Sequence, residues 1–174
     1  MPRNVEMKAR LRDPGRAEQI AARLSGTSGE AIHQVDTFFA CERGRLKLRI
    51  LGSDSGELIL YERPDLAGAR TSRYLIARTP DPVNLHKILS AALETTGTVI
   101  KARRLFLVGQ TRVHIDAVEG LGSFLELEVV LGFGQGESEG KQIAERLLAE
   151  FEIAPDQLIA EAYVDLLRKK ARGA

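Results

Sequence analysis

Four short stretches of the sequence alternate charged with apolar residues: residues 5–8, 45–49, 112–116 and 126–129. Successive side chains of a β-strand point to opposite faces, so the charges of each stretch share one face and the apolar residues share the other. Cations are bunched at 45–49, whereas carboxylates are bunched at 126–129. Cations suit a polyphosphate and carboxylates suit a divalent metal ion, so the pattern predicts a site for a metal ion together with a polyphosphate.

The carboxylates that could ligate a metal ion all lie in these stretches, and they are Glu6, Asp116, Glu126 and Glu128. Mg²⁺ and Mn²⁺ prefer oxygen ligands and usually bind through a few carboxylates together with substrate phosphates. Any one of these acids alone is explained equally well as a solvated residue paired with a neighbouring cation. Their joint occurrence on strands with apolar alternation favours the metal site.

The candidate phosphate ligands are lysines and arginines of the predicted strands: Lys8, Arg45, Lys47, Arg49, Arg63, Lys101, Arg103 and Arg112. An arginine can bind phosphate oxygens through two parallel hydrogen bonds, whereas a lysine acts as a point charge. His114 lies on the same predicted face as Arg112 and Asp116. We interpret His114 as a hydrogen-bonded structural residue, with an acid–base group as the alternative.

Strand signals outnumber helix signals along the chain. Alternation and turn residues predict strands over about residues 3–11, 34–40, 44–51, 57–63, 72–78, 98–108, 111–118 and 123–132. Helices are predicted over about residues 15–24, 81–93, 137–150 and 155–170. The first two helices follow Asp-Pro pairs, which suit an N-cap and the first helical position.

An antiparallel sheet with so many charges on one face cannot bury that face in an apolar core without a heavy cost. Closing the sheet into a barrel removes the difficulty, because the charged face then lines a wet interior and the apolar face packs outward. We therefore predict an α+β fold made of a single domain over residues 1–174. Its core is a closed eight-stranded antiparallel β-barrel, or tunnel, with a polar charged interior and helices packed outside.

The bulk composition narrows the function. The chain has 174 residues and a net charge of +1, which argues against a general nucleic-acid or membrane-surface binder. Its single cysteine excludes an intrachain disulfide and a cysteine-based zinc cluster. No apolar run reaches membrane-spanning length and no secretory signal is seen, so we expect a soluble cytoplasmic protein. The phosphate-loop and dinucleotide motifs are also absent from the sequence.

Several segments resemble a known family. Residues 5–8 resemble the Glu-x-Glu-x-Lys signature of the CYTH superfamily, the triphosphate tunnel metalloenzymes. Residues 34–49, 57–64 and 114–128 resemble, in the same order, the later sequence blocks of that family. The resemblance implies an eight-stranded tunnel that binds a triphosphate with one or two divalent cations, Mg²⁺ or Mn²⁺. By position it implies that the four acids named above ligate the metal and that the eight cations bind the triphosphate, with Glu6, Lys8 and Glu126 as catalytic residues.

The family includes class IV adenylate cyclases, thiamine triphosphatases and inorganic triphosphatases. Residues 36–39 and 121–128 resemble the class IV adenylate cyclase branch, which implies conversion of ATP to cyclic AMP and pyrophosphate. The alternative is a triphosphatase that hydrolyses thiamine triphosphate or inorganic tripolyphosphate. Asn4 stands where the signature has its first acid, so a non-catalytic domain that binds polyphosphate or nucleotide is a third interpretation. The resemblance is also compatible with a homodimer.

Overall fold

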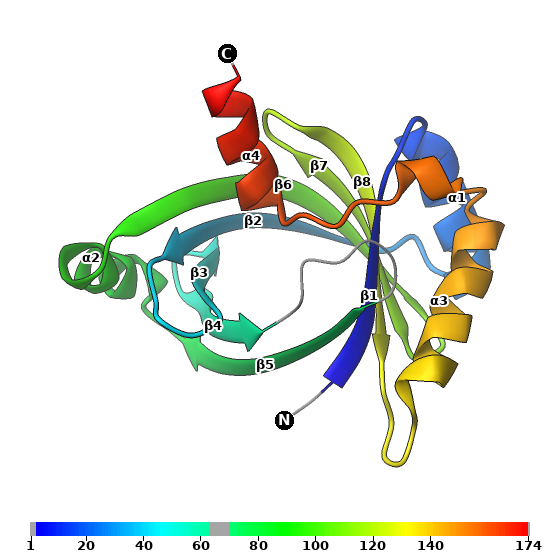
Figure 1. Cartoon of the computed structure of the whole chain (residues 1–174), viewed down its shortest axis with the longest axis horizontal. Helices are drawn as coiled ribbons and strands as arrows, with labels where there is room; N and C mark the ends of the chain where they lie inside the picture. Colours follow the sequence, from blue (N-terminus) through cyan, green and yellow to red (C-terminus); the bar gives the residue numbers. More distant parts are fainter. Residues whose placement is uncertain (1–2, 63–69, 174) are drawn as a thin grey trace.

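Eight antiparallel strands close into a barrel in the computed structural model of the chain, which describes residues 3–62 and 70–173 (Figure 1). The elements in chain order are β1 (Arg3–Arg10), α1 (Pro14–Ser25), β2 (Glu30–Phe39), β3 (Arg45–Gly52), β4 (Ser55–Glu62), β5 (Arg70–Thr79), α2 (Pro82–Ala92), β6 (Thr95–Val108), β7 (Thr111–Val118), β8 (Gly122–Val130), α3 (Glu137–Glu150), the 3₁₀ helix η1 (Pro155–Gln157) and α4 (Tyr163–Arg172). The order round the barrel is β1-β5-β4-β3-β2-β6-β7-β8. The predicted fold class is therefore confirmed.

The first two helices begin where the Asp-Pro pairs predict. Asp13 Oδ1 accepts a hydrogen bond from the backbone N–H of Arg16 at 2.9 Å, and Asp81 Oδ1 accepts one from Asn84 at 3.1 Å. Each aspartate thus satisfies a backbone donor that the first turn leaves without a helical partner. Helix α1 lies against β6, β7 and β8, whereas α2 lies against β3 and β4. None of the described helices is both long and apolar enough to cross a membrane.

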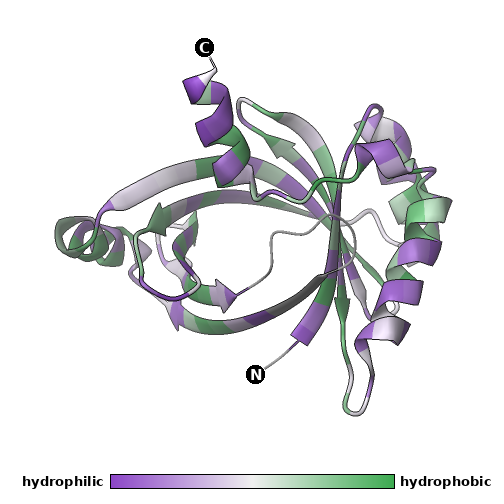
Figure 2. Ribbon diagram, in the orientation of Figure 1, coloured by the Kyte–Doolittle hydropathy of each residue, from purple (hydrophilic) through white to green (hydrophobic). Residues whose placement is uncertain are grey.

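The main apolar core lies outside the barrel, between its wall and two helices. Leu125, Leu127 and Val129 on β8 are fully buried and pack with Val5 and Met7 of β1 against α1 and α3. Burying each such side chain contributes about 1.5–3 kcal/mol. Figure 2 shows polar and apolar residues alternating along the strands, as the sequence pattern predicts. With the apolar residues packed outward on β1 and β8, the charged residues between them face the interior.

A smaller apolar cluster occupies the inner surface at one end of the barrel. Phe38, Val99 and Phe124 face inward there and pack against Tyr163 and Val164 at the start of α4. Figure 1 shows α4 beside the rim formed by β6 and β7. The start of α4 therefore bounds the interior at this end.

The prediction of one helix over residues 155–170 is wrong. After η1 the chain is extended, and α4 begins only at Tyr163. The backbone N–H of Ile159 donates to the carbonyl of Lys8 at 2.9 Å, and Leu158 forms a bridge with Ala9. Backbone groups engaged with β1 cannot also serve a helix, so tertiary pairing overrides the local helical preference. Strand β2 is also longer than predicted, because residues 30–33 pair with β6.

Candidate active site

The inward-facing side chains surround a cavity of about 870 Å³, lined by residues from all eight strands and from the start of α4. Pockets that hold small ligands typically measure about 300–1,000 Å³. The described cations of this cavity are Lys8, Lys47, Arg49, Arg78, Lys101, Arg103 and Arg112. Its described acids are Glu6, Glu30, Asp36, Asp54, Glu57, Glu126 and Glu128. Among the described lining residues, acids therefore equal cations in number.

One wall carries two cations held by a buried carboxylate. Asp36 on β2 accepts hydrogen bonds from Lys47 Nζ at 2.8 Å and from Arg49 Nε and Nη2 at 2.9 Å each. Burial alone would raise the pKa of Asp36, but the charges of Lys47 and Arg49 outweigh it and hold that pKa well below its usual value. The ionised Asp36 therefore fixes both cations of β3 in position.

A second buried carboxylate holds the cations of β6. Asp116 has no exposed surface, and Arg103 donates to it through Nε at 2.6 Å and Nη2 at 2.7 Å. Lys101 Nζ lies 3.3 Å from Asp116 Oδ2, and the hydroxyl of Tyr163 donates to the same oxygen at 3.1 Å. Burial would raise the pKa of Asp116, but Lys101 and Arg103 lower it to about 2. Asp116 is therefore ionised, and both of its oxygens are engaged in holding these neighbours.

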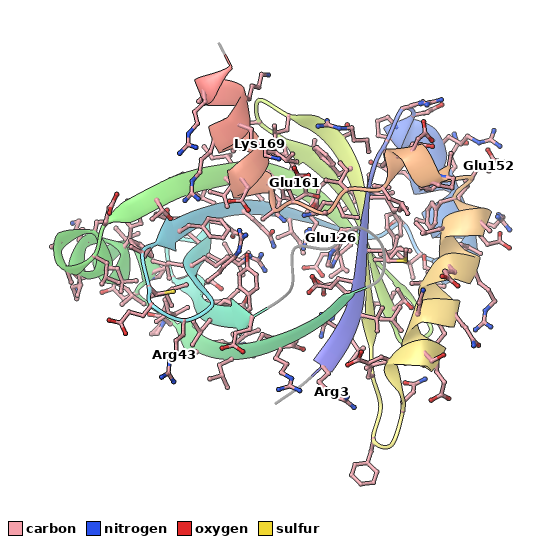
Figure 3. All side chains as sticks on the ribbon, in the orientation of Figure 1. Arg3, Arg43, Glu126, Glu152, Glu161 and Lys169 are labelled. Atoms are coloured by element: carbon pink, nitrogen blue, oxygen red, sulfur yellow. The ribbon has the colours of Figure 1, made fainter. Side chains whose placement is uncertain are left out.

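A group of possible metal donors lies on β7 and β8. His114, Glu126 and Glu128 each offer one ligand atom, and these atoms lie within 4.8 Å of one another. The strand register explains the grouping, because His114 is directly opposite Glu126 and Glu128 follows on the same face of β8. Glu126 also lies 3.5 Å from Lys8 Nζ and 2.8 Å from Arg103 Nη2. Figure 3 shows Glu126 in the interior of the barrel.

The protonation states of this group suit metal binding. Burial would raise the pKa of Glu126, but Lys8, Lys101 and Arg103 hold it well below its usual value. The pKa of Glu128 is also lowered. Burial, followed by the charge of Arg103, lowers the pKa of His114 to about 4. At neutral pH the group thus presents two carboxylates and a neutral imidazole, which are ligand types for divalent ions.

The other predicted residues of β1 and β7 reach the same part of the cavity. Glu6 and Lys8 both line it, and the β1–β8 register sets Glu6 opposite Glu128 and Lys8 opposite Glu126. Arg112 also lines it and lies 3.3 Å from Glu128 through Nη1. The structure therefore brings these predicted acids and cations together.

Two predicted residues lie elsewhere, and the structure does not describe a third. Arg45 does not line the described cavity, and its Nη1 donates to Asp165 of α4 at 2.6 Å. Asp116 lies behind Lys101 and Arg103 rather than on the cavity surface. Arg63 lies outside the described residues.

Sequence reasoning assigned no role to two residues of the site. Asp36 alternates with Gln34 and Phe38 on one strand face, so the strand pattern could have identified its inward position. Tyr163 had no such signal, because it fell inside the segment expected to be one long helix. His114, interpreted from the sequence as a hydrogen-bonded structural residue, has no hydrogen-bond partner at Nδ1 among the described residues.

Comparison of the sequence with known families supports the same architecture. The model of the CYTH domain matches residues 2–163. The chain belongs to the CYTH family. No curated protein matches the CYTH chain at a significant level.

Solved structures share the fold of this CYTH protein. The PH1012 protein of Pyrococcus horikoshii is 19% identical with a TM-score of 0.78, over 94% of this chain and 98% of that chain. A proposed adenylate cyclase of Vibrio parahaemolyticus is 15% identical with a TM-score of 0.71, over 95% and 97%. A proposed adenylate cyclase of Bacillus halodurans is 15% identical with a TM-score of 0.60, over 95% and 98%. At these identities the likeness establishes the tunnel fold alone.

Proposed function

We propose that this CYTH protein is a metal-dependent enzyme that converts ATP to cyclic AMP and pyrophosphate inside the barrel. The observation that carries the proposal is a group of ionised acids facing fixed cations within one cavity. The resemblance of residues 36–39 and 121–128 to the class IV adenylate cyclase branch supports the choice of reaction. The shared fold with two proposed adenylate cyclases agrees with it.

The donors on β7 and β8 fit a divalent cation. Glu126 and Glu128 offer ionised oxygens, and Glu6 lies opposite Glu128. Once bound there, Mg²⁺ or Mn²⁺ would polarise phosphoryl oxygens and offset negative charge. We assign Asp116 to positioning Lys101 and Arg103 rather than to the metal, because it holds both cations from behind and, unlike Glu126, does not line the cavity.

The charge balance of the cavity supports metal dependence. The described lining acids equal the described lining cations in number. Without a metal ion, the described lining residues therefore have little net charge with which to attract a triphosphate. A divalent ion at Glu126 and Glu128 would offset the charge of these two acids and give the cavity a net positive charge toward the phosphates. Arginine side chains, through paired hydrogen bonds, and lysine ammonium groups would then orient the phosphates and stabilise negative charge on the leaving pyrophosphate.

One side of the cavity favours a substrate with an organic group. Ile59, Tyr61, Tyr74 and Ile76 of β4 and β5 line that side and offer apolar and aromatic surface. Aromatic side chains suit the flat face of a base or heterocycle. This observation favours a nucleotide over inorganic tripolyphosphate. It also supports the second candidate function, hydrolysis of thiamine triphosphate, because that substrate carries an aromatic ring.

Phosphorus NMR of the purified protein with ATP, thiamine triphosphate or tripolyphosphate, each with Mg²⁺ and then Mn²⁺, tests the proposal. We expect pyrophosphate and cyclic AMP from ATP, and no reaction after chelation of the metal. Release of orthophosphate would overturn the cyclase assignment in favour of a triphosphatase. Tight binding without turnover of any substrate would instead identify a domain that only binds polyphosphate, and Asn4→Glu would then test whether the missing acid is the reason.

Triphosphate binding is expected to weaken as the pH rises through about 8. Burial and the charge of Arg49 lower the pKa of Lys47 to about 8, although Asp36 opposes the shift. A bound polyphosphate favours the ammonium form and raises that pKa, so binding takes up a proton where free Lys47 is partly neutral. Calorimetric titration with α,β-methylene-ATP in buffers of different ionisation enthalpy measures this proton uptake.

The control for this prediction is Lys47→Arg. Arginine keeps its proton at all accessible pH values, so the share of proton uptake that Lys47 contributes should disappear. Comparison with the wild-type protein also cancels the titration of the ligand itself. The same proton uptake in both proteins would show that Lys47 is not the titrating group.

A further inference from the structure

His114 presents an unpartnered nitrogen inside the barrel. Its side chain is only 4% exposed, and Nδ1 has no hydrogen-bond partner among the described residues. A buried polar atom without a partner costs about 1–3 kcal/mol. Folded proteins seldom retain such an atom unless a bound ion, a water molecule or a function compensates for it.

The surroundings of this nitrogen are two carboxylates at equal distance. Nδ1 lies 3.9 Å from Glu126 Oε2 and 3.9 Å from Glu128 Oε1. These separations are too long for hydrogen bonds. An ion bonded at about 2.1 Å to each of two donors allows them to be up to about 4.2 Å apart. Nδ1 therefore has a spacing to each carboxylate oxygen that a single ion can bridge, and all three atoms lie within 4.8 Å of one another.

The backbone holds these donors in place. His114 and Glu126 are direct cross-strand partners on β7 and β8, and Glu128 is two residues further along the same face. Their strands are backed by buried Val113, Ile115 and other residues of the outer core. Donors carried by paired strands are positioned more rigidly than donors on loops. The geometry is therefore a property of the barrel wall.

We propose that His114 is a direct nitrogen ligand of the divalent ion held by Glu126 and Glu128, and that it selects a first-row transition ion such as Mn²⁺ over Mg²⁺. The inference rests on the proposed function, because it assumes that the cavity takes a divalent ion. Mg²⁺ demands a near-octahedral set of oxygen ligands and loses its water molecules reluctantly, whereas the first-row transition ions bind nitrogen ligands with an affinity that rises from Mn²⁺ towards Cu²⁺. A neutral nitrogen in place of a third carboxylate also reduces the charge that favours a hard ion.

Pulsed electron paramagnetic resonance on the untagged full-length protein loaded with Mn²⁺ alone tests this assignment. We expect the wild-type spectrum to contain coupling to a directly bonded imidazole nitrogen. In His114→Gln the coupling should disappear and Mn²⁺ affinity should fall by about 10–100-fold, the range observed when the support of a metal ligand is removed. Mg²⁺ affinity, measured by competition against Mn²⁺, should change less.

A variant that keeps His114 and removes the other histidines assigns the nitrogen coupling independently. The chain has three histidines, so the double variant His33→Gln with His86→Gln retains His114 alone. This variant should keep the full nitrogen coupling, and it assigns the coupling to His114 even where His114→Gln folds poorly.

The outcomes separate this inference from the proposed function. Mn²⁺ bound by the wild-type protein without nitrogen coupling would overturn the role of His114 and leave the carboxylate site standing. Coupling that persists in His114→Gln would also overturn it. Absence of any Mn²⁺ binding would overturn both the inference and the metal-dependent function, whereas phosphorus NMR tests the reaction independently.

Discussion

Replacing Glu126 by glutamine is expected to lower cyclic AMP formation from ATP by about 10²–10³-fold, the range for removing one preorganised electrostatic group. Glu126 lies 3.5 Å from Lys8 and 2.8 Å from Arg103, and it belongs to the proposed metal group. Glutamine keeps the shape and the oxygen that accepts from Arg103, but it loses the charge that holds a divalent ion. The measurement is the initial rate at saturating Mn²⁺ and ATP.

The matched control is Glu145→Gln on the outer helix α3. Glu145 lies at the surface and makes an ion pair of 3.8 Å with Lys141, so the same change of charge should leave the rate unaltered. Far-ultraviolet circular dichroism checks that both variants are folded. Wild-type turnover by Glu126→Gln would remove Glu126 from the catalytic site and with it the strongest argument for the metal position.

Replacing Asp116 by alanine is expected to lower the free energy of unfolding by about 3–5 kcal/mol, even without metal or substrate. Asp116 is fully buried and holds Arg103, Lys101 and Tyr163 through its two oxygens. Its removal leaves two buried cations without their main compensating charge. Urea unfolding followed by circular dichroism measures the loss.

The control is Asp156→Ala, which breaks an ion pair of 3.5 Å with Arg12 between side chains that are 70% and 80% exposed. Exposed pairs contribute little, so this change should stay within about 0.5 kcal/mol. A comparably small loss for Asp116→Ala in the absence of metal would contradict a positioning role. Asp116 would then return to the group of candidate metal ligands.

Acid should remove part of the same stability. Burial opposes ionisation of Asp116, but Lys101 and Arg103 lower its pKa in the folded protein to about 2, below the value of about 3.9 in an unfolded chain. The folded state therefore binds the proton less readily, and the resulting stability is present above about pH 4 and lost as the pH falls towards 2. Asp116→Asn should have a flatter stability profile across this window, measured by urea unfolding at each pH.

The sequence by itself determined which way the side chains face. Residues 45–49 and 126–129 alternate with period two. Lys47 and Arg49 therefore had to share one strand face, and Glu126 and Glu128 had to share another. The cost of burying such faces predicted the barrel, and Asp13 and Asp81 predicted where two helices begin. Strand-face alternation and helix N-caps depend on residues that are close together in the sequence, so the sequence alone can specify them.

Only the tertiary structure decided which inward residues meet. The pairing of His114 with Glu126, and the enclosure of Asp116 by Lys101, Arg103 and Tyr163, depend on strand register and on closure of the barrel. Tyr163 reaches Asp116 because residues 158 and 159 bond to β1 instead of forming a helix. Period-two alternation fixes a face but leaves the partner across the strand open, since each register is set by contacts between distant parts of the chain. The charges of the site were therefore visible in the sequence, whereas the distinction between a buried support and a metal donor required the fold.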